Sequence, residues 1–266
     1  MSSSIDRLEQ EIRQSIGYDR LVSSIDATGG VALAWPDLRQ SFAQNERGWT
    51  LEADQVEFTG QPGLVARTYV FRKGEGQLDI DVFVSSRGPA PALRRLVDTL
   101  AATSIGYRRY QPGPADIGQL CLVLPLTNPT VLVINHNVYL SLRLSDGSMD
   151  IVALARELTK LMDAHRVPVL AVKAPAFAAL SAAPSTARVG ESVKIAVGLP
   201  TAFAADQLLW SLSYEIEAGV VDERGRGTDY LELRIMQPGR IEVPLWLADR
   251  RTLLSSESRV GIDVRP

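Results

Sequence analysis

The stretch LVARTYVFRKGEGQLDIDVFVS, residues 64–85, decides how the first part of the chain folds. Two runs rich in β-branched and aromatic residues flank Gly74-Glu75-Gly76, a short connection whose glycines tolerate the positive φ of a hairpin turn. The second run alternates apolar and polar residues, as a strand does in a sheet with one wet face. Its expected core-facing residues are Leu78, Ile80, Val82 and Val84, and its expected solvent-facing residues are Asp79, Asp81 and Ser85. The stretch therefore predicts a β-hairpin.

The order strand, turn, strand, helix occurs a second time further along the chain. An amphipathic helix at residues 90–102 follows the first hairpin. A second hairpin at residues 130–144 turns at Asn135-His136-Asn137, and another amphipathic helix follows it at residues 151–162. The two turn centres, Glu75 and His136, are 61 residues apart. A fixed spacing of this kind is typical of an internal repeat.

We interpret residues 1–173 as an α+β domain that contains a duplicated β-β-β-α unit, with repeats at 49–104 and 110–165. Chance periodicity is the alternative, because few residues are identical between the two segments. A single unit of this kind cannot bury its sheet face alone, so we expect the two to form one sheet with both helices on one side.

The composition changes at residues 174–183, which are rich in Ala and Pro and predict a linker. Residues 184–266 contain only strand and turn patterns, with five strands expected at residues 192–199, 208–217, 229–236, 241–247 and 259–264. The opening PSTARVGESVKIAV from Pro184, the segment PGRIEVPLWL from Pro238 and the closing RVGIDVRP from Arg259 carry a resemblance. They are similar to strands of bacterial immunoglobulin-like domains. The resemblance implies an all-β immunoglobulin-like sandwich over 184–266.

Such domains serve mostly in adhesion, scaffolding or spacing, and most often outside the cytoplasm. The disulfide of antibody domains cannot form here, because the chain has a single cysteine, Cys121. Trp210 or Trp246 is then expected to fill the core without it. Cys121 lies in the apolar run LCLVL, so we expect a buried thiol with little reactivity.

Charge and hydropathy limit the partners and the compartment. The 266 residues carry a net charge of −3, which provides no general attraction for nucleic acid. The amino terminus lacks a signal-peptide pattern, and no stretch approaches the ~18–20 apolar residues of a membrane span. We expect no membrane insertion and a cytoplasmic protein, or a periplasmic or secreted one if a leader has been removed.

The sequence offers no catalytic, cofactor-binding or metal-binding residue that we assign. The two histidines, His136 and His165, lie in a predicted turn and at a predicted helix end, and no nucleophile motif accompanies them. The strongest metal candidate is the pair Asp79 and Asp81, whose carboxylates project from one face of a strand. Pairing of these acids with Arg72 or Lys73 on the neighbouring strand is the favoured interpretation.

The function predicted from these observations is a non-catalytic protein-interaction or scaffold module whose partner is another protein. Expected contact residues are Arg72, Asp79 and Asp81 on the first hairpin and the segment Tyr107, Arg108, Arg109 and Tyr110, read as a solvated edge strand. One alternative is a cytoplasmic chaperone or regulatory subunit that dimerises through an amphipathic helix at residues 3–16. Another is an enzyme whose signature would be a polar pocket with perturbed pKa values.

Overall fold

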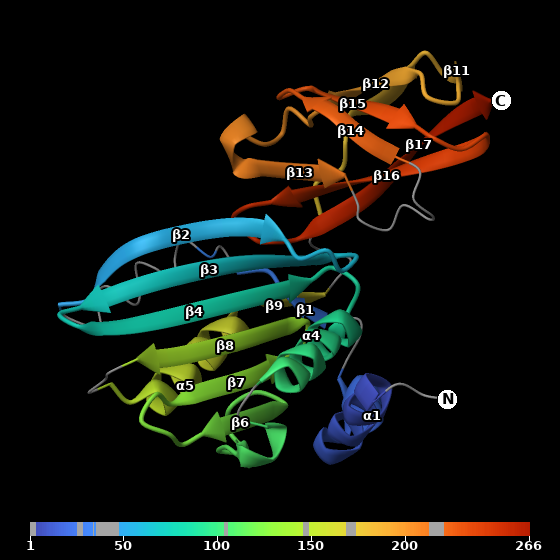
Figure 1. The fold of residues 1–266 in the computed structure, drawn as a ribbon. Helices are drawn as coiled ribbons and strands as arrows, with labels where there is room; N and C mark the ends of the chain where they lie inside the picture. Colours follow the sequence, from blue (N-terminus) through green and yellow to red (C-terminus); the bar gives the residue numbers. More distant parts are fainter. Residues whose placement is uncertain are drawn as a thin grey trace. The chain divides into compact units, whose positions relative to one another are not determined.

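A computed structural model describes residues 4–25, 29–33, 35, 48–103, 106–145, 149–168, 174–212 and 221–266. In this part of the chain most of the regular structure is strand, in several sheets, accompanied by four α-helices (Figure 1). The protein is therefore of mixed α and β composition, as expected. The chain divides into two compact units. Unit 1 comprises residues 1–57, 64–173 and 251–253, and unit 2 comprises 58–63, 174–250 and 254–266.

Unit 1 is built on one seven-stranded sheet with the order β2-β3-β4-β8-β7-β6-β5. From β3 to β5, each pair of neighbours is antiparallel. The strands are β2 (Thr50–Phe58), β3 (Leu64–Lys73), β4 (Gly76–Ser85), β5 (Gln111–Pro112), β6 (Leu120–Leu124), β7 (Thr130–Asn135) and β8 (Val138–Ser145). The centre of the sheet is the pair β4–β8, which joins the two hairpins predicted from the sequence.

Both hairpins turn in two residues rather than the three expected. Lys73 pairs with Gly76 in the first hairpin, and Asn135 pairs with Val138 in the second. The first turn residue has a positive φ in each case, 59° at Gly74 and 53° at His136, as in a type II′ turn. The corresponding residues of the two hairpins are therefore 62 positions apart, and the spacing of 61 was wrong by one.

Helices α4 (Pro89–Ala102) and α5 (Ile151–Ala164) follow this spacing closely, because they begin and end 62 residues apart. Each helix buries six side chains, and every buried position of α4 has a buried counterpart in α5. The six pairs are Pro89 and Ile151, Ala92 and Leu154, Leu93 and Ala155, Leu96 and Leu158, Val97 and Thr159, and Leu100 and Met162. Whether the two halves arose by duplication stays a prediction.

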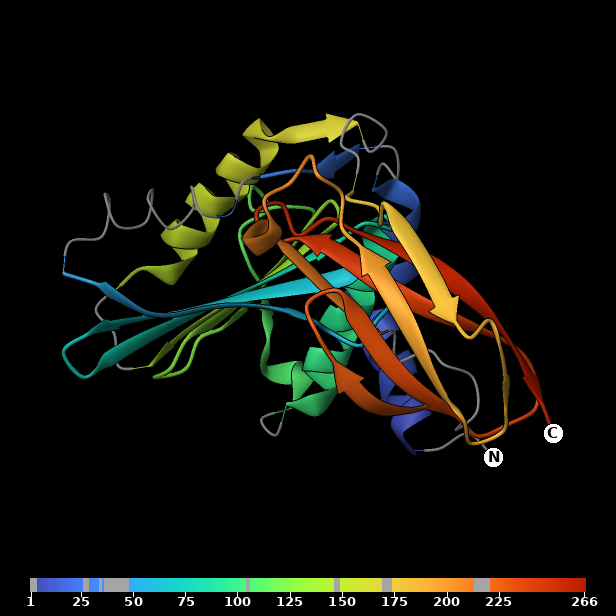
Figure 2. The same cartoon turned by 90° about the horizontal axis from the view of Figure 1, so that it is seen from above.

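The two helices lie on opposite faces of the sheet, and the expectation of one shared side was wrong (Figures 1 and 2). On the face of α5, which we call the covered face, β4 and β8 pair only apolar residues, from Leu78 with Leu144 to Val84 with Val138. On the face of α4, the open face, the same strands are apolar only where Phe83 pairs with Tyr139. Because the covered face is apolar along these strands, α5 buries more apolar surface there than it would on the open face.

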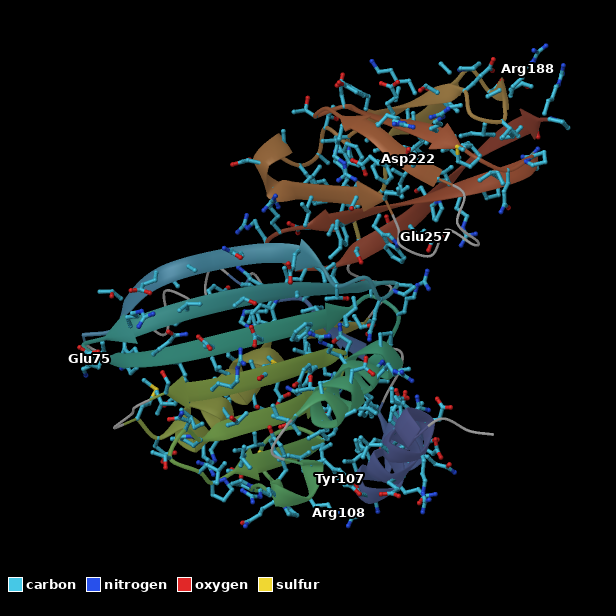
Figure 3. The ribbon with its side chains drawn as sticks, in the orientation of Figure 1. Glu75, Tyr107, Arg108, Arg188, Asp222 and Glu257 are labelled. Atoms are coloured by element: carbon cyan, nitrogen blue, oxygen red, sulfur yellow. The ribbon has the colours of Figure 1, made fainter. Side chains whose placement is uncertain are left out.

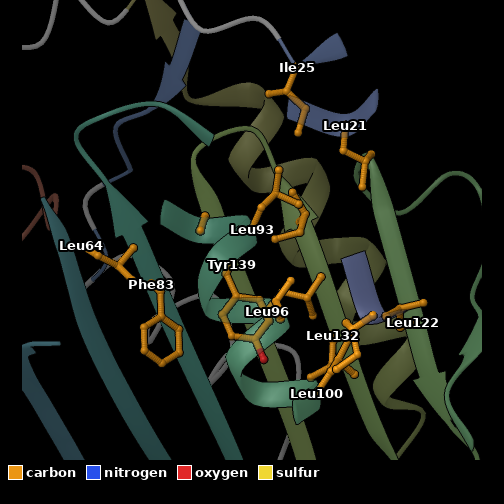
Figure 4. Close-up of a cluster of buried hydrophobic side chains, with 14 of the residues drawn as sticks. Leu21, Ile25, Leu64, Phe83, Leu93, Leu96, Leu100, Leu122, Leu132 and Tyr139 are labelled. Atoms are coloured by element: carbon orange, nitrogen blue, oxygen red, sulfur yellow. The ribbon is translucent and has the colours of Figure 1, made fainter. Parts of the chain in front are cut away.

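The N-terminal helices α1 (Ser4–Ile16) and α2 (Tyr18–Ser24) pack on α4. Ile12 is fully buried in a cluster with Leu21, Ile25 and the apolar side of α4, and Leu8 and Ile16 pack against it (Figure 4). The apolar stripe of α1 therefore belongs to the core of its own chain. A small sheet pairs β1 (Gly29–Val31) with β9 (Arg166–Pro168). No helix among the described residues is both long and apolar enough to span a bilayer.

Unit 2 consists of two four-stranded sheets that share one apolar core. One sheet has the order β10-β12-β15-β14, and the other has the order β11-β17-β16-β13. The strands are β10 (Ala179–Ala183), β11 (Thr186–Arg188), β12 (Ser192–Gly198), β13 (Leu208–Leu212), β14 (Val221–Arg226), β15 (Tyr230–Ile235), β16 (Gly239–Asp249) and β17 (Ser255–Arg265). Both sheets supply core residues, among them Ile195, Leu233, Leu245 and Ile262.

Part of the predicted linker 174–183 is a strand of this unit. Residues 179–183 form β10, which pairs along its whole length with β12. Leu180 packs against the core while its neighbours face outward, so the alternation of one apolar residue among small ones is enough for an edge strand. Of the two candidate tryptophans, Trp210 packs against this core, whereas Trp246 is buried outside it.

Candidate functional site

A cavity with a volume of about 890 Å³ lies on the open face of the sheet in unit 1. We call it the groove. Its wall is the C-terminal half of α4, and its floor comes from β4, β8 and β7. The side chains that give it chemical character are Asp79, Asp81, Arg95, Tyr110, Tyr139 and Arg143.

The groove exists because the polar end of the open face is left without a helix. Asp79 pairs across the strands with Arg143, and Asp81 pairs with Ser141. Polar residues at alternate positions of both strands offer no apolar surface to a covering helix, so α4 packs on the aromatic end instead. The result is a hollow with a charged end on β4 and β8 and an aromatic end beside α4.

At the charged end, Arg143 joins the two acids. Its Nη2 lies 3.5 Å from a carboxylate oxygen of Asp79 and 3.3 Å from one of Asp81. Thr68 Oγ1 also donates to Asp81 at 2.8 Å, and Gln77 Nε2 donates to Asp79 at 2.7 Å. One arginine thus faces two carboxylates whose side chains are 21% and 17% exposed.

At the aromatic end, the Phe83 and Tyr139 rings stack with centroids 5.3 Å apart, and the Arg95 guanidinium lies 4.7 Å from the Phe83 centroid. Figure 4 shows Phe83 and Tyr139 next to Leu96 of α4. The Tyr139 side chain is buried, and neither its hydroxyl nor Arg95 Nε has a hydrogen-bond partner among the described residues. Both atoms are buried, so neither is open to a molecule in the groove.

The phenols of the groove are held in their neutral form. Burial raises the pKa of Tyr139, and it outweighs the opposite influence of the nearby Thr99 and Ser141 hydroxyls, neither of which has hydrogen-bond geometry with the phenol. Burial also raises the pKa of Tyr110, against a smaller lowering by Thr103 and Arg143. Both side chains therefore act as hydrogen-bond donors at neutral pH and not as bases.

The predicted contact residues fall in two places. Asp79, Asp81 and Tyr110 line the groove, whereas Arg72 lies across from Gln77 at its rim and binds Glu52 at 2.6 Å. The expected pairing of the two acids with Arg72 was therefore wrong, since Arg143 takes that role.

The segment Tyr107–Arg109 is a 3₁₀ helix, η1, rather than the expected edge strand. Arg108 donates to Glu11 of α1 at 3.2 Å, and the Tyr107 hydroxyl donates to the same carboxylate at 3.5 Å. Figure 3 labels Tyr107 and Arg108. Arg109 ends η1 with its side chain exposed. Tyr107 and Arg108 thus lie at α1, and none of the three residues is among those that line the groove.

Three residues of the groove were missed at the sequence level, Arg95, Tyr139 and Arg143. A signal for Arg143 was present, because Ser141 and Arg143 alternate with leucines just as Asp79 and Asp81 alternate with apolar residues. No sequence signal marked Arg95 or Tyr139, since their shared contact with Phe83 depends on strand pairing and helix packing.

A second, smaller cavity of about 370 Å³ surrounds His136 in the turn between β7 and β8. The His136 backbone N–H donates to Gln119 Oε1 at 2.7 Å, and its Nε2 lies 3.8 Å from Asp163 Oδ1. Asn135 donates to the same Asp163 oxygen at 3.0 Å. The described residues that line this cavity include no serine, threonine, cysteine or lysine, so none of them is a nucleophile that the histidine and aspartate could activate.

Cys121 is buried on β6, as expected, and burial raises the pKa of its thiol to about 11. A thiol of this kind is largely protonated at neutral pH and reacts slowly. Within the described ranges, no group of three or more His, Cys, Asp or Glu side chains is placed to hold a metal ion.

Comparison with known proteins adds no assignment: no family model matches the chain, and no curated protein is similar to it in sequence. The inference of function therefore depends on the residues of the groove.

Proposed function

We propose that this protein is a non-catalytic interaction module, and that the groove of unit 1 binds a segment of a partner protein. The observation that carries the proposal is the combination, in one cavity, of a guanidinium stacked on an aromatic pair at one end and two partly exposed carboxylates at the other. A polypeptide supplies both acceptors and donors along its length, so it matches both ends of the groove.

The size of the cavity agrees with a segment of chain. At about 890 Å³ it lies near the upper end of the ~300–1,000 Å³ typical of ligand pockets. Its floor offers Phe83, Leu132 and Tyr139 as apolar and aromatic surface, and aromatic residues together with arginine are enriched where proteins bind one another.

An enzyme remains the alternative that a polar pocket with perturbed pKa values would indicate. The direction of the pKa shifts in the groove argues against an enzyme. A general base works best when its pKa lies near the working pH, whereas burial moves the pKa values of Tyr110 and Tyr139 upward from the ordinary tyrosine value of about 10. The groove is thus equipped to donate hydrogen bonds.

Unit 2 supports a spacer or scaffold role through its strand order. Labelled in the immunoglobulin manner, β10, β12, β15 and β14 follow the order A-B-E-D, and β13, β16 and β17 take the places of C, F and G. This agrees with an immunoglobulin-like sandwich. A chaperone or regulatory subunit that dimerises through α1 has no comparable support, because Ile12 and its apolar neighbours pack within the chain.

The proposal is tested by filling the groove with a side chain that leaves the core intact. Ala102 lines the groove at the exposed end of α4, so Ala102→Trp blocks it. Lys160→Trp places the same side chain at an exposed position of α5, on the other face of the sheet, and serves as the control. The intact protein and both variants are used as baits for proteins of the source organism, and retained proteins are identified by mass spectrometry.

We expect a protein that is retained by the unmodified chain and by Lys160→Trp and is lost with Ala102→Trp. Equal retention by all three would show that the groove is not the binding surface. Retention of no protein by any of them would contradict a partner-binding role.

A further inference from the structure

The charged end of the groove holds one cation for two acids. Arg143 Nη2 lies 3.5 Å from a carboxylate oxygen of Asp79 and 3.3 Å from one of Asp81. The other described side chains that bind these carboxylates are neutral, since Gln77 donates to Asp79 and Thr68 donates to Asp81. Two negative charges and one positive charge leave this end of the groove with a net charge of −1.

The neighbouring arginines do not supply the missing positive charge. Arg72 binds Glu52 at 2.6 Å, and Arg67 binds Asp54 on the covered face. Arg95 is stacked at the aromatic end of the groove. The negative charge is therefore left for a cation from outside the chain.

The two acids can be reached from the groove. Asp79 and Asp81 both line it, and their side chains are 21% and 17% exposed. The Arg143 side chain is 56% exposed, and ion pairs of exposed side chains contribute little to stability. A competing cation can therefore displace the Arg143 side chain into solvent.

We propose that a lysine of the partner segment places its ammonium group between Asp79 and Asp81, where Arg143 Nη2 lies in the free chain. This inference rests on the proposed function of the groove. A single nitrogen atom of Arg143 contacts both carboxylates, so the spacing of the acids suits a compact cation. A lysine ammonium is a point charge with three donors, whereas a guanidinium spreads its charge over a planar fork.

A lysine fits this place better than a metal ion does. Ca²⁺ takes six to eight oxygen ligands, and no group of three or more acidic, histidine or cysteine side chains is gathered among the described residues. Gln77 turns its amide nitrogen toward Asp79, and Thr68 uses its hydroxyl as a donor to Asp81. Both neighbours therefore act as donors here.

The test uses two matched peptides, acetyl-Gly-Gly-Lys-Gly-Gly-amide and its norleucine counterpart, which keeps the length of the side chain and lacks the charge. Each is titrated into the intact protein at physiological ionic strength and followed by amide chemical shifts. Calcium chloride is titrated separately. We expect the lysine peptide to shift amides around Asp79, Asp81 and Arg143 and to bind about fivefold more tightly than the norleucine peptide, as for a partly exposed ion pair.

Three substitutions assign the effect to the charged end. Arg143→Met removes the competing cation, so we expect the lysine peptide to bind about fivefold more tightly. Asp81→Asn should reduce the preference for lysine over norleucine to about one, because the remaining acid is then balanced by Arg143. Arg156→Met removes the same charge from α5, on the other face of the sheet, and should leave binding unchanged. Thermal melts of the variants check that the fold is retained.

The outcomes separate this inference from the proposed function. Equal binding of both peptides in the groove would overturn the lysine and leave segment binding intact, and tighter binding of calcium would replace the lysine by a metal ion. No shift with either peptide would overturn the lysine too, and the Ala102→Trp baits would then decide the proposed function. An Arg143→Met variant that binds the lysine peptide no more tightly than the unmodified chain does would show that Arg143 does not hold the place of the lysine.

Discussion

The two faces of the seven-stranded sheet use the same strands for different purposes. On the covered face, β4 and β8 present an unbroken apolar surface, from Leu78 and Leu144 at one end to Val84 and Val138 at the other. On the open face, the aromatic pair of Phe83 and Tyr139 gives way within two residues to charged and polar pairs. The covered face therefore packs in the core along its whole length, whereas the open face packs at its aromatic end and is exposed at its polar end.

This difference explains why two helices with the same pattern of buried positions end on opposite faces. The apolar stripe of α5 finds partners along the covered face, while the open face has room for one helix only, at its aromatic end. The groove lies on the part of the open face that α4 does not cover. A binding surface thus arises where the apolar pattern of the strands stops.

The largest expected effect contrasts two ion pairs of β3 with β2, one on each face. Arg67 of the covered face binds Asp54 through two hydrogen bonds of 2.6 and 2.7 Å, and its side chain is 9% exposed. We expect Arg67→Ala to lower the free energy of unfolding by about 3–5 kcal/mol, because it leaves a carboxylate poorly solvated. Urea denaturation measures the change, and a loss below about 1 kcal/mol would show that water replaces the arginine.

The helix cores provide a comparison at equivalent positions. Leu96 of α4 and Leu158 of α5 are both buried, and they lie 62 residues apart. We expect Leu96→Ala and Leu158→Ala each to cost about 2–5 kcal/mol, since both open a cavity in a packed core. Similar values in urea denaturation would show that the two faces are equally well packed around their helices. A much smaller value for Leu96→Ala would show that the open face relaxes into the groove.

The buried thiol of Cys121 on the covered face should make the free energy of unfolding depend on pH. Burial raises its pKa to about 11, with a partly opposing influence of Arg156, whereas an unfolded thiol titrates near 8.5. Above that lower value the unfolded chain releases the proton and the native chain keeps it, so stability falls as the pH rises toward 11. We expect this contribution to reach about 2–3 kcal/mol.

Urea denaturation of the unmodified protein and of Cys121→Ala, repeated across the alkaline range, isolates the contribution of the thiol. The unmodified protein should lose more stability with rising pH than the variant does, because all other groups are shared. Parallel pH profiles would contradict a raised thiol pKa.

The smallest expected effect concerns Arg72, the counterpart of Arg67 on the open side. It binds Glu52 at 2.6 Å, but the two side chains are 44% and 47% exposed. We expect Arg72→Ala to change the free energy of unfolding by less than about 1 kcal/mol, because exposed ion pairs contribute little. The same urea measurement applies, and a loss as large as that of Arg67→Ala would show that exposure does not distinguish the two pairs.

Much of the fold followed from periodicity in the sequence. The alternation in residues 77–85 correctly predicted a strand with an apolar face toward the core. The helical spacing of residues 90–102 and 151–162 correctly predicted α4 and α5. In the C-terminal part, the strands β12, β13, β15, β16 and β17 lie at the five segments expected to be strands. Residues 213–217 of the expected strand 208–217 lie outside the described residues. The short strand β10 was missed, because small residues in a Pro-rich stretch resemble a linker.

The candidate site was only partly predictable for a physical reason. Asp79 and Asp81 stood out because polar residues interrupted an apolar strand, but Arg143, their partner, lies more than sixty residues away and meets them only through the β4–β8 register. The contact of Arg95 with Phe83 required α4 to fold back over the open face. Neither relation has a local signature in the chain.

The sequence by itself determined which side chains alternate along each strand, which helix positions are apolar, and that Cys121 lies among apolar neighbours, because these properties depend on nearby residues alone. The tertiary structure alone decided which face each helix covers and which residues meet across the central strands. Those choices depend on the summed apolar area of segments that are distant in the chain. The groove, with its paired acids at one end and the stacked Arg95, Phe83 and Tyr139 at the other, results from those long-range contacts.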